Sequence, residues 1–307
     1  MKKFILNEKQ KVIIILLIIT LVHTVLRFYM GLRNIFFYVS FAISNLLVYK
    51  TCKSLFKDSL ISLLACIFNA FSIVAIKNYN YNIIYELCNL FTLAITYFHI
   101  KIWRKNNFKV YKLFPIAALF ALGSLTGYNF FIYSTILYLV FTLKYFKNKN
   151  YNNLLKYQLA ILLSCIIFIV IDHFISVPQI SFATKNIPEK FLNYILLINS
   201  DFLNKLFLLF IIIIGFICYR KKCKDLKFNS QMFLLVFPLA VYLLASMILA
   251  PCADLSYIIP IYSVFSISTF YITKKYTFEH LNNREFIFVL ILLVTIFAYG
   301  SISPIIF

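Results

Sequence analysis

The carboxylate best placed for chemistry is Glu86, which lies about one turn inside a run of apolar residues. Tyr79 and Asn82 precede it at intervals of three and four residues, so on a helix the three side chains share one face. An ionised carboxylate in an apolar segment is costly unless it faces a polar cavity or a partner charge. The spacing therefore predicts one wall of a substrate cavity. The alternative is an interfacial carboxylate that reaches outward to water or pairs with Arg27 or Arg33.

Two aspartates offer further acid or base groups. Asp172 adjoins His173 at the end of an apolar run, but neighbouring helical side chains point about 100° apart, so the two do not form a pair on their own. A plain helix-end aspartate is the alternative. Asp254 follows Pro251 in a short loop, where it could orient a sugar or a phosphate-bound metal, or simply cap the loop. Both aspartates join Glu86 as candidate catalytic residues.

Arg27 and Arg33 are the most favourable anion-binding residues in the chain. A guanidinium group offers the two-pronged geometry that a lipid phosphate or pyrophosphate needs. The alternative is that both arginines anchor the protein to lipid headgroups. The sequence contains no phosphate-binding glycine loop, no serine nucleophile motif and no histidine-rich metal helix.

Composition places these residues in a membrane. The 307-residue chain is 63% hydrophobic and 13% charged, with a mean hydropathy of +0.89, and a soluble protein cannot cover that much apolar surface. Its 30 basic residues against 10 acidic ones fall in short clusters between apolar runs and form no recognition module, so we expect no nucleic-acid partner. The seven cysteines include no C-x-x-C pair and suit packing rather than a metal site.

Apolar runs predict an all-α, polytopic transmembrane bundle of about 11 spans, because about 20 helical residues cross a hydrocarbon core. Residues 113–146 show the pattern, with two apolar runs joined by a polar hinge from Ser124 to Asn129. Several runs are short for a full span and are expected to tilt. The eleven runs lie at about 12–30, 35–49, 59–76, 81–100, 113–126, 128–146, 157–175, 206–219, 231–250, 257–273 and 286–306.

Basic residues predict the orientation, since Lys and Arg concentrate in cytoplasmic loops. With the N-terminus in the cytoplasm, all but six of the 30 basic residues fall on the cytoplasmic side. The first run lacks a signal-peptide cleavage site and predicts a retained helix. We therefore expect one integral membrane domain over 1–307. The six basic residues on the outer side are Arg27, Arg33, Lys77, Lys185, Lys190 and Lys205.

The longest segment on the outer side is 172–205. Its apolar stretch 191–198 is too short to span a membrane and too apolar for a free loop. We expect an amphipathic helix in the outer interface. A helical lid packed on the bundle is the alternative.

Four stretches carry a resemblance to a known family. Residues 32–56 are similar to a helix that begins with Arg and ends in a basic turn with "LF", and residues 78–97 are similar to the aromatic outer start of the next hairpin. Residues 122–131 look like an outer hinge of the form LG-x-LTHYYF, and residues 256–260 like an RY-x-x-P helix start. The chain thus resembles the GT-C superfamily, membrane glycosyltransferases that use polyprenyl-phosphate sugars and include dolichyl-phosphate-mannose protein mannosyltransferase-like proteins.

The resemblance implies substrate-cavity positions for Thr126, Tyr128 and Tyr257, which match motif residues. Gly127 stands where the family has His, and Ser256 where it has Arg. The resemblance also implies a departing phosphate that needs stabilising cations. The candidates for that phosphate are Arg27, Arg33 and Lys77.

One departure concerns the catalytic base. The family's first large outer loop carries an acidic residue that activates the acceptor, whereas residues 31–34 alone join the first two runs here and contain no acid. No residue inherits the base by position, and Glu86 or Asp254 would replace it only in a rearranged site. The cofactor is left open, with a divalent cation as one choice.

Three functions remain open. The first is transfer of a sugar from a polyprenyl-phosphate carrier to a glycan or lipid acceptor, at the outer face of a bacterial plasma membrane during envelope assembly. The second is a non-catalytic GT-C-like protein that binds a polyprenyl lipid or a partner enzyme, which the short first loop favours. The third is a carrier, flippase or polymerase-like protein for lipid-linked saccharides, which the lack of paired Gly/Pro-broken helices disfavours.

Overall fold

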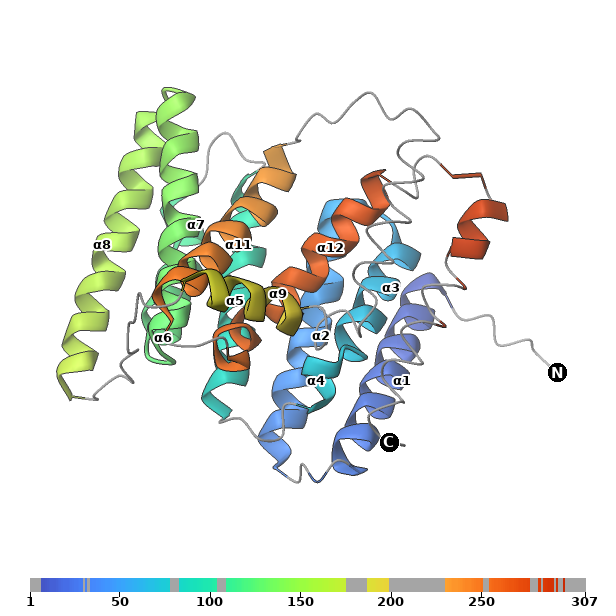
Figure 1. Cartoon of the computed structure of the whole chain (residues 1–307). Helices are drawn as coiled ribbons and strands as arrows, with labels where there is room; N and C mark the ends of the chain where they lie inside the picture. The colour runs from blue at the N-terminus through green and yellow to red at the C-terminus, as the bar shows by residue number, and fades with distance from the viewer. Residues whose placement is uncertain are drawn as a thin grey trace. The chain divides into compact units, whose positions relative to one another are not determined.

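The fold is helical throughout the part that the structure describes (Figure 1). This computed structural model describes residues 7–29, 31, 34–77, 83–103, 109–174, 187–198, 230–250, 254–276, 281–282, 284–289, 291 and 295. Five of the described helices are long and apolar enough to cross a membrane, and the predicted all-α fold is confirmed for the described residues. They are α1 (Glu8–Tyr29), α2 (Ile35–Phe56), α5 (Ile83–Trp103), α7 (Tyr128–Lys147) and α8 (Tyr151–Phe174).

Shorter elements complete the described fold. The predicted run 206–219 and most of 286–306 lie outside the described residues. The short α-helices are α3 (Ser59–Ala70), α4 (Ile73–Lys77), α6 (Phe114–Ser124), α9 (Ile187–Leu197), α11 (Ser230–Leu249) and α12 (Tyr262–Tyr276). The 3-10 turns are η2 (Val110–Lys112), η4 (Leu255–Tyr257) and η5 (Ile259–Ile261).

Two predicted runs differ from the observed helices. The run 59–76 is broken between α3 and α4, where the Ser72 hydroxyl accepts a hydrogen bond from the Ala75 N–H at 3.2 Å and caps the start of α4. The run 257–273 opens with 3-10 turns before α12, and Pro260 lies in the second of them. Hydropathy does not register either feature, because the residues remain apolar or small.

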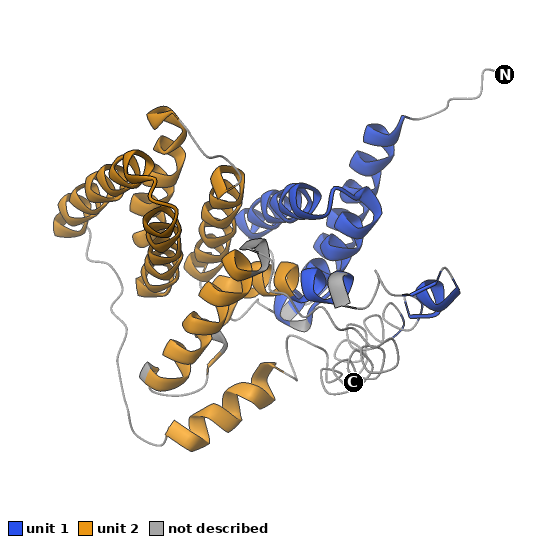
Figure 2. Ribbon diagram, turned by 90° about the horizontal axis from the view of Figure 1, so that it is seen from above, with its two compact units in different colours: residues 1–80, 199–223, 269–307 blue, residues 81–198, 224–268 orange. Residues whose placement is uncertain are grey.

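The chain divides into two compact units (Figure 2). Unit 1 comprises residues 1–80, 199–223 and 269–307, and unit 2 comprises residues 81–198 and 224–268. The single membrane domain expected from sequence stays a prediction.

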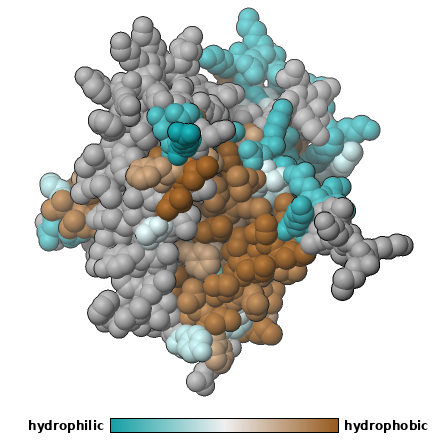
Figure 3. All heavy atoms as spheres, turned by 90° about the vertical axis from the view of Figure 1, so that its right-hand side faces the viewer, coloured by the Kyte–Doolittle hydropathy of each residue, from teal (hydrophilic) through white to brown (hydrophobic). Residues whose placement is uncertain are grey.

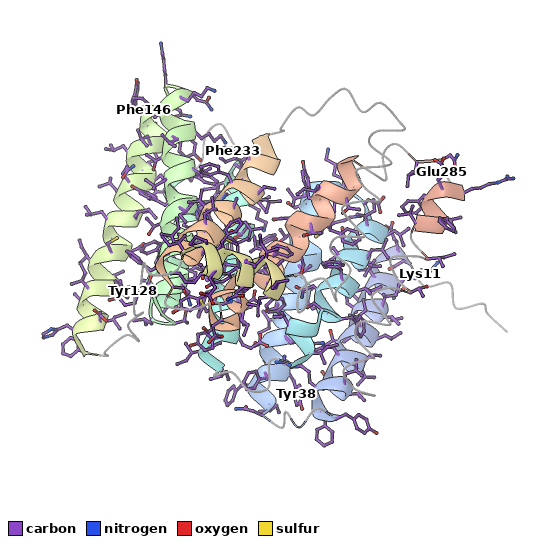
Figure 4. All side chains as sticks on the ribbon, viewed as in Figure 1. Lys11, Tyr38, Tyr128, Phe146, Phe233 and Glu285 are labelled. Atoms are coloured by element: carbon purple, nitrogen blue, oxygen red, sulfur yellow. The ribbon has the colours of Figure 1, made fainter. Side chains whose placement is uncertain are left out.

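In unit 1, α1, α2 and α3 pack together around the α2–α3 turn. Lys57 adopts the left-handed conformation after α2, and Asp58 caps the N-terminus of α3. The Ser59 hydroxyl donates to the Glu8 carboxylate at 2.7 Å and accepts from the Lys53 ammonium. The start of α1, the end of α2 and the start of α3 therefore lie at one end of the unit. Figure 4 shows Tyr38 near the opposite end.

An extended apolar surface covers α1. Seen from the side on which this helix lies, apolar side chains form a broad area with hydrophilic residues toward one edge (Figure 3). Exposure of so large an apolar surface to water is energetically unfavourable, so the surface suits contact with lipid. The exposed apolar residues of α1 include Ile13, Leu17, Ile18, Leu21, Val22, Val25 and Phe28.

In unit 2, α6 and α7 form the hairpin expected over 113–146. Gly127 joins them at φ +133°, a conformation that L residues rarely adopt. Gly123 lets α6 approach α7 closely, because a Cβ atom there would lie 2.4 Å from Phe130 Cζ. The hairpin is thus closed by two glycines with different roles, and Tyr128 and Phe146 mark the two ends of α7 (Figure 4).

The far end of α7 lies beside the end of α5. The Lys144 ammonium donates to the Trp103 carbonyl oxygen and lies 4.1 Å from the centre of the Trp103 ring. A cation at the C-terminus of α5 satisfies a free carbonyl and complements the helix dipole. Helices α5 and α7 therefore run parallel, and both begin at the end of unit 2 that holds the α6–α7 hinge.

Helix α9 lies in the outer segment expected over 172–205 and packs on α11. The buried Lys190 ammonium donates to the carbonyl oxygens of Ile248 and Ala250, at 3.1 and 2.8 Å, at the C-terminus of α11. Tyr194 is also buried, whereas Leu192 and other apolar residues of α9 are exposed. The contacts are those of a packed helix with an outward apolar face. Its location in the membrane interface stays a prediction.

Candidate functional site

Glu86 lies in the first turn of α5 and is fully buried within unit 2. Its place in the first turn puts it at the hinge end of this unit, where α5 begins. Tyr79 and Asn82, expected on the same helix face, lie outside the described residues. The predicted cavity wall is thus represented here by Glu86 alone.

One turn further along α5, Asn89 fixes the start of α12. Its amide nitrogen donates to the Ser263 hydroxyl at 3.0 Å, and its amide oxygen accepts from the Ser263 N–H at 3.1 Å. That N–H is among the backbone donors at a helix start that have no partner within the helix. Turn η5 also packs on α5. The turn of α5 that carries Glu86 therefore leads directly into a rigid junction.

A second junction joins α7 and α11 to turn η4. The Asn129 amide donates to the Ser256 carbonyl oxygen at 3.3 Å, and the Tyr242 hydroxyl donates to the Tyr257 carbonyl oxygen at 2.7 Å. The first turn of α7 and the residues before α12 are thereby held at the hinge end of unit 2. We call Glu86, Asn129, Asp254, Ser256 and Tyr257 the hinge-end cluster.

Asp254 acts as a turn cap within this cluster. Its carboxylate accepts the Ser256 N–H at 2.9 Å, an arrangement typical of aspartate two residues before the donor. One carboxylate oxygen is thus occupied by backbone, and the side chain is half-buried. The loop-cap interpretation fits this geometry.

The three residues assigned to the cavity by resemblance have varied surroundings. The Thr126 hydroxyl donates to the Gly123 carbonyl oxygen at 2.6 Å and satisfies the end of α6. Tyr128 is half-buried as the first residue of α7, and Tyr257 is half-buried in η4. The structure places all three at the hinge end of unit 2, and their contact with a substrate stays a prediction.

Asp172 lies in the last turn of α8, which packs on α6 and α7. The side chain is half-buried, and its neighbour His173 is exposed, with its ring 5.4 Å from that of Phe174. Much of α8 exposes apolar side chains. The position is that of a helix-end residue on a largely outward-facing helix.

The candidate phosphate-binding residues belong to unit 1. Arg27 is fully buried near the end of α1, with its guanidinium carbon 5.4 Å from the centre of the Phe37 ring. Lys77 ends α4, and Arg33 lies outside the described residues. Convergence of these cations with Glu86 stays a prediction.

Sequence reasoning missed a set of buried polar residues inside the apolar helices of unit 1. His23 in α1, Asn45 in α2 and Asn69 in α3 are all nearly or fully buried in unit 1. The available signal was a polar residue at the centre of an apolar run, a placement that usually marks a functional position. The described residues contain no group of three or more His, Cys, Asp or Glu side chains suited to a metal ion.

Comparisons with known proteins found no match to any family model, any curated protein or any solved structure.

Proposed function

We propose that the protein is a multi-pass membrane glycosyltransferase of the GT-C type, which uses a polyprenyl-phosphate-linked sugar at the outer face of the bacterial plasma membrane. The observation that carries the proposal is Glu86, a fully buried carboxylate in the first turn of a helix long enough to span a membrane. Buried carboxylates in such helices are rare and generally functional. The motif resemblance of residues 122–131 and 256–260 supports the same assignment.

In the proposed topology the N-terminus is cytoplasmic and the chain crosses the membrane eleven times. Support comes from the basic residues at the helix ends. In unit 1, Lys53 and Glu8 meet at one end, and in unit 2, Lys144 lies at the end remote from the Gly127 hinge. Alkaline phosphatase fused after Gly127 should be active, and fused after Lys149 it should be inactive. The reverse pattern would exclude this orientation.

In the proposed reaction, Glu86 accepts the proton of an acceptor hydroxyl while the oxygen attacks the anomeric carbon of the sugar. The bond between that carbon and the carrier phosphate breaks, and the polyprenyl phosphate leaves with the bonding electrons. A general base and cations near the leaving phosphate are the two requirements of such a transfer. The hinge-end cluster of unit 2 is proposed to border the sugar. The cations expected from the sequence are Arg27, Arg33 and Lys77.

The direct test is turnover by the purified full chain in proteoliposomes that contain a radiolabelled polyprenyl-phosphate hexose and an envelope lipid acceptor. The proposal expects labelled acceptor together with free polyprenyl phosphate. Glu189→Gln is a matched control, since Glu189 is an exposed acid of unit 2 and its substitution should leave turnover unchanged. A panel of common hexose donors without any turnover would contradict the proposal.

A second candidate is a non-catalytic protein that binds a polyprenyl lipid. Asp254 favours it, because a carboxylate that caps a turn is one fewer candidate for the catalytic base. This alternative expects saturable binding of polyprenyl phosphate without release of sugar. Binding and turnover are measured on the same proteoliposomes, so the two candidates are distinguished in one preparation.

A further inference from the structure

Unit 1 contains a buried histidine of which only one ring nitrogen forms a hydrogen bond within the described residues. His23 Nδ1 lies 2.7 Å from the Ala70 carbonyl oxygen, and its ring stacks on Phe41 at 3.5 Å between centroids. A carbonyl oxygen only accepts, so Nδ1 carries the hydrogen and, in the neutral ring, Nε2 carries a lone pair. Nε2 is buried and has no hydrogen-bond partner among the described residues.

Asn69, the residue before Ala70, is fully buried. Neither its amide nitrogen nor its amide oxygen has a hydrogen-bond partner among the residues described. Asn45 is half satisfied, because its amide nitrogen donates to the Thr20 hydroxyl at 3.2 Å while its amide oxygen has no such partner. The hydroxyl groups of Ser40 and Ser44 also have no hydrogen-bond partner among the described residues.

Contacts between α1, α2 and α3 bring His23, Asn45 and Asn69 close to one another, and Ser40 and Ser44 are buried on the same helix as Asn45. On α3, Cys66 Sγ lies 3.6 Å from the Asn45 carbonyl oxygen of α2, and Asn69 follows Cys66 by three residues on the same helix face. On α1, Thr20 contacts Asn45, and His23 lies three residues further along. Two successive turns of α1, α2 and α3 thus direct polar atoms inward. We call His23, Ser40, Ser44, Asn45 and Asn69 the polar core of unit 1.

The chemistry of these atoms defines what they can bind. His23 Nε2 and the Asn45 amide oxygen accept hydrogen bonds, the Asn69 amide both donates and accepts, and the serine hydroxyls do either. An anion could only accept and a metal ion could not use the amide donor. A hydroxyl group both donates and accepts, so it matches the set. Buried polar groups in proteins are almost always satisfied by a partner or an ordered water.

We propose that the polar core of unit 1 is a binding site for hydroxyl groups, supplied either by ordered water or by the hydroxylated headgroup of a membrane lipid. The site is built from α1, α2 and α3 alone and is independent of sugar transfer. Its five residues serve to hold these hydroxyl groups between the helices.

The substitution Asn69→Leu tests the proposal by the sign of its effect, because leucine is close to asparagine in size. If Asn69 binds hydroxyl groups, leucine removes those bonds and leaves other groups unsatisfied, so the melting temperature of the purified full chain falls by about 3 °C or more. If the core is dry, leucine removes an unsatisfied amide and the melting temperature stays or rises, which would overturn the proposal. Thr51→Val is the matched control. The buried Thr51 hydroxyl already donates to the Leu47 carbonyl oxygen at 2.7 Å, so a much smaller change is expected.

A second measurement on the wild-type chain identifies the source of the hydroxyl groups and stands even if the variant fails to fold. Native mass spectrometry that finds a glycolipid or another hydroxylated lipid bound to the wild type indicates the lipid. Ordered density between His23 and Asn69 in a high-resolution structure, without a bound lipid, indicates water. Absence of both in the wild-type chain would overturn the proposal.

Discussion

Asn89 and Asn129 of unit 2 differ from Asn69 of unit 1 in how their buried side chains are satisfied. In unit 2, Asn89 exchanges two hydrogen bonds with Ser263, and Asn129 donates to the Ser256 carbonyl oxygen. In unit 1, Asn69 is equally buried, yet its side chain makes no hydrogen bond to the described residues. Asn89 and Asn129 therefore join elements of unit 2, whereas the Asn69 amide keeps its hydrogen-bonding capacity within the described residues.

The buried histidines show the same contrast. His99 in unit 2 uses both ring nitrogens, with Nδ1 2.7 Å from the Ile95 carbonyl oxygen and Nε2 2.5 Å from the Tyr157 hydroxyl. His23 in unit 1 uses only Nδ1. Polar groups that are satisfied within the protein rigidify a core, whereas polar groups left over need an external partner. The ring of His99 is thus satisfied within unit 2, whereas the proposed binding site of unit 1 includes the remaining nitrogen of His23.

The largest effect is expected for Asn89→Leu. This change removes both hydrogen bonds between Asn89 and Ser263. The buried N–H and hydroxyl of Ser263 then lose their bonds to the amide, which should lower the free energy of unfolding by about 3 kcal/mol. Thermal unfolding of the purified chain measures the loss. Asn193→Leu on the exposed surface of α9 is the control and should change stability by less than about 0.5 kcal/mol. Equal effects of the two variants would refute the assigned role of Asn89.

A smaller loss is expected for Gly123→Ala in the α6–α7 hairpin. The new Cβ atom would lie 2.4 Å from the ring of the fully buried Phe130, and such overpacking costs about 1–3 kcal/mol. The double variant Gly123→Ala with Phe130→Leu should recover part of this loss, because leucine leaves room for the methyl group. If the stability losses of the two substitutions simply add, the contact between residue 123 and Phe130 does not limit how closely α6 and α7 approach.

Tyr157→Phe tests the satisfied histidine of unit 2. It removes the hydroxyl that donates to His99 Nε2 and should cost about 1 kcal/mol. Tyr151→Phe, at the exposed start of α8, serves as the control. A double-mutant cycle between Tyr157→Phe and His99→Phe should show coupling, whereas additive losses would mean that the hydrogen bond contributes nothing.

The smallest structural effect is expected at Asp254. Asp254→Asn keeps an oxygen that accepts the Ser256 N–H, so stability should stay within about 0.5 kcal/mol, while Asp254→Ala should lose about 1 kcal/mol. If Asp254 only caps the turn, the asparagine variant should keep its transfer activity, and the alanine variant should lose activity only as far as it loses stability. If the asparagine variant is stable and has no activity, Asp254 is the catalytic base in place of Glu86.

Much of the helical frame follows from local sequence. The apolar run 128–146 corresponds to α7 (Tyr128–Lys147), and the hinge of residues 124–129 contains the turn that Gly127 permits. The break before α4 could not be predicted, because Ser72 caps a helix by a hydrogen bond that hydropathy does not describe. Local periodicity thus predicts where helices run better than where they are interrupted.

The candidate site was predictable only in part, because its geometry depends on distant contacts. The unusual depth of Glu86 is visible in the sequence, and the structure finds this residue fully buried. The bond from His23 reaches a residue 47 positions away, and that from Asn89 a residue 174 positions away. No spacing rule within one segment contains such information. The same reasoning explains why Asp254 could be either a cap or a catalytic group until its turn was seen.

The measurement that tests the central claim most directly is the sugar-transfer rate of Glu86→Gln, determined beside its melting temperature in the same proteoliposomes. Glutamine is close to glutamate in size but cannot accept the proton of an acceptor hydroxyl. The account predicts a folded variant that still binds polyprenyl-phosphate hexose and transfers sugar at least 100-fold more slowly, within the about 10²–10⁴-fold range of general base catalysis. A folded variant with wild-type turnover would contradict the assignment of Glu86 as the base.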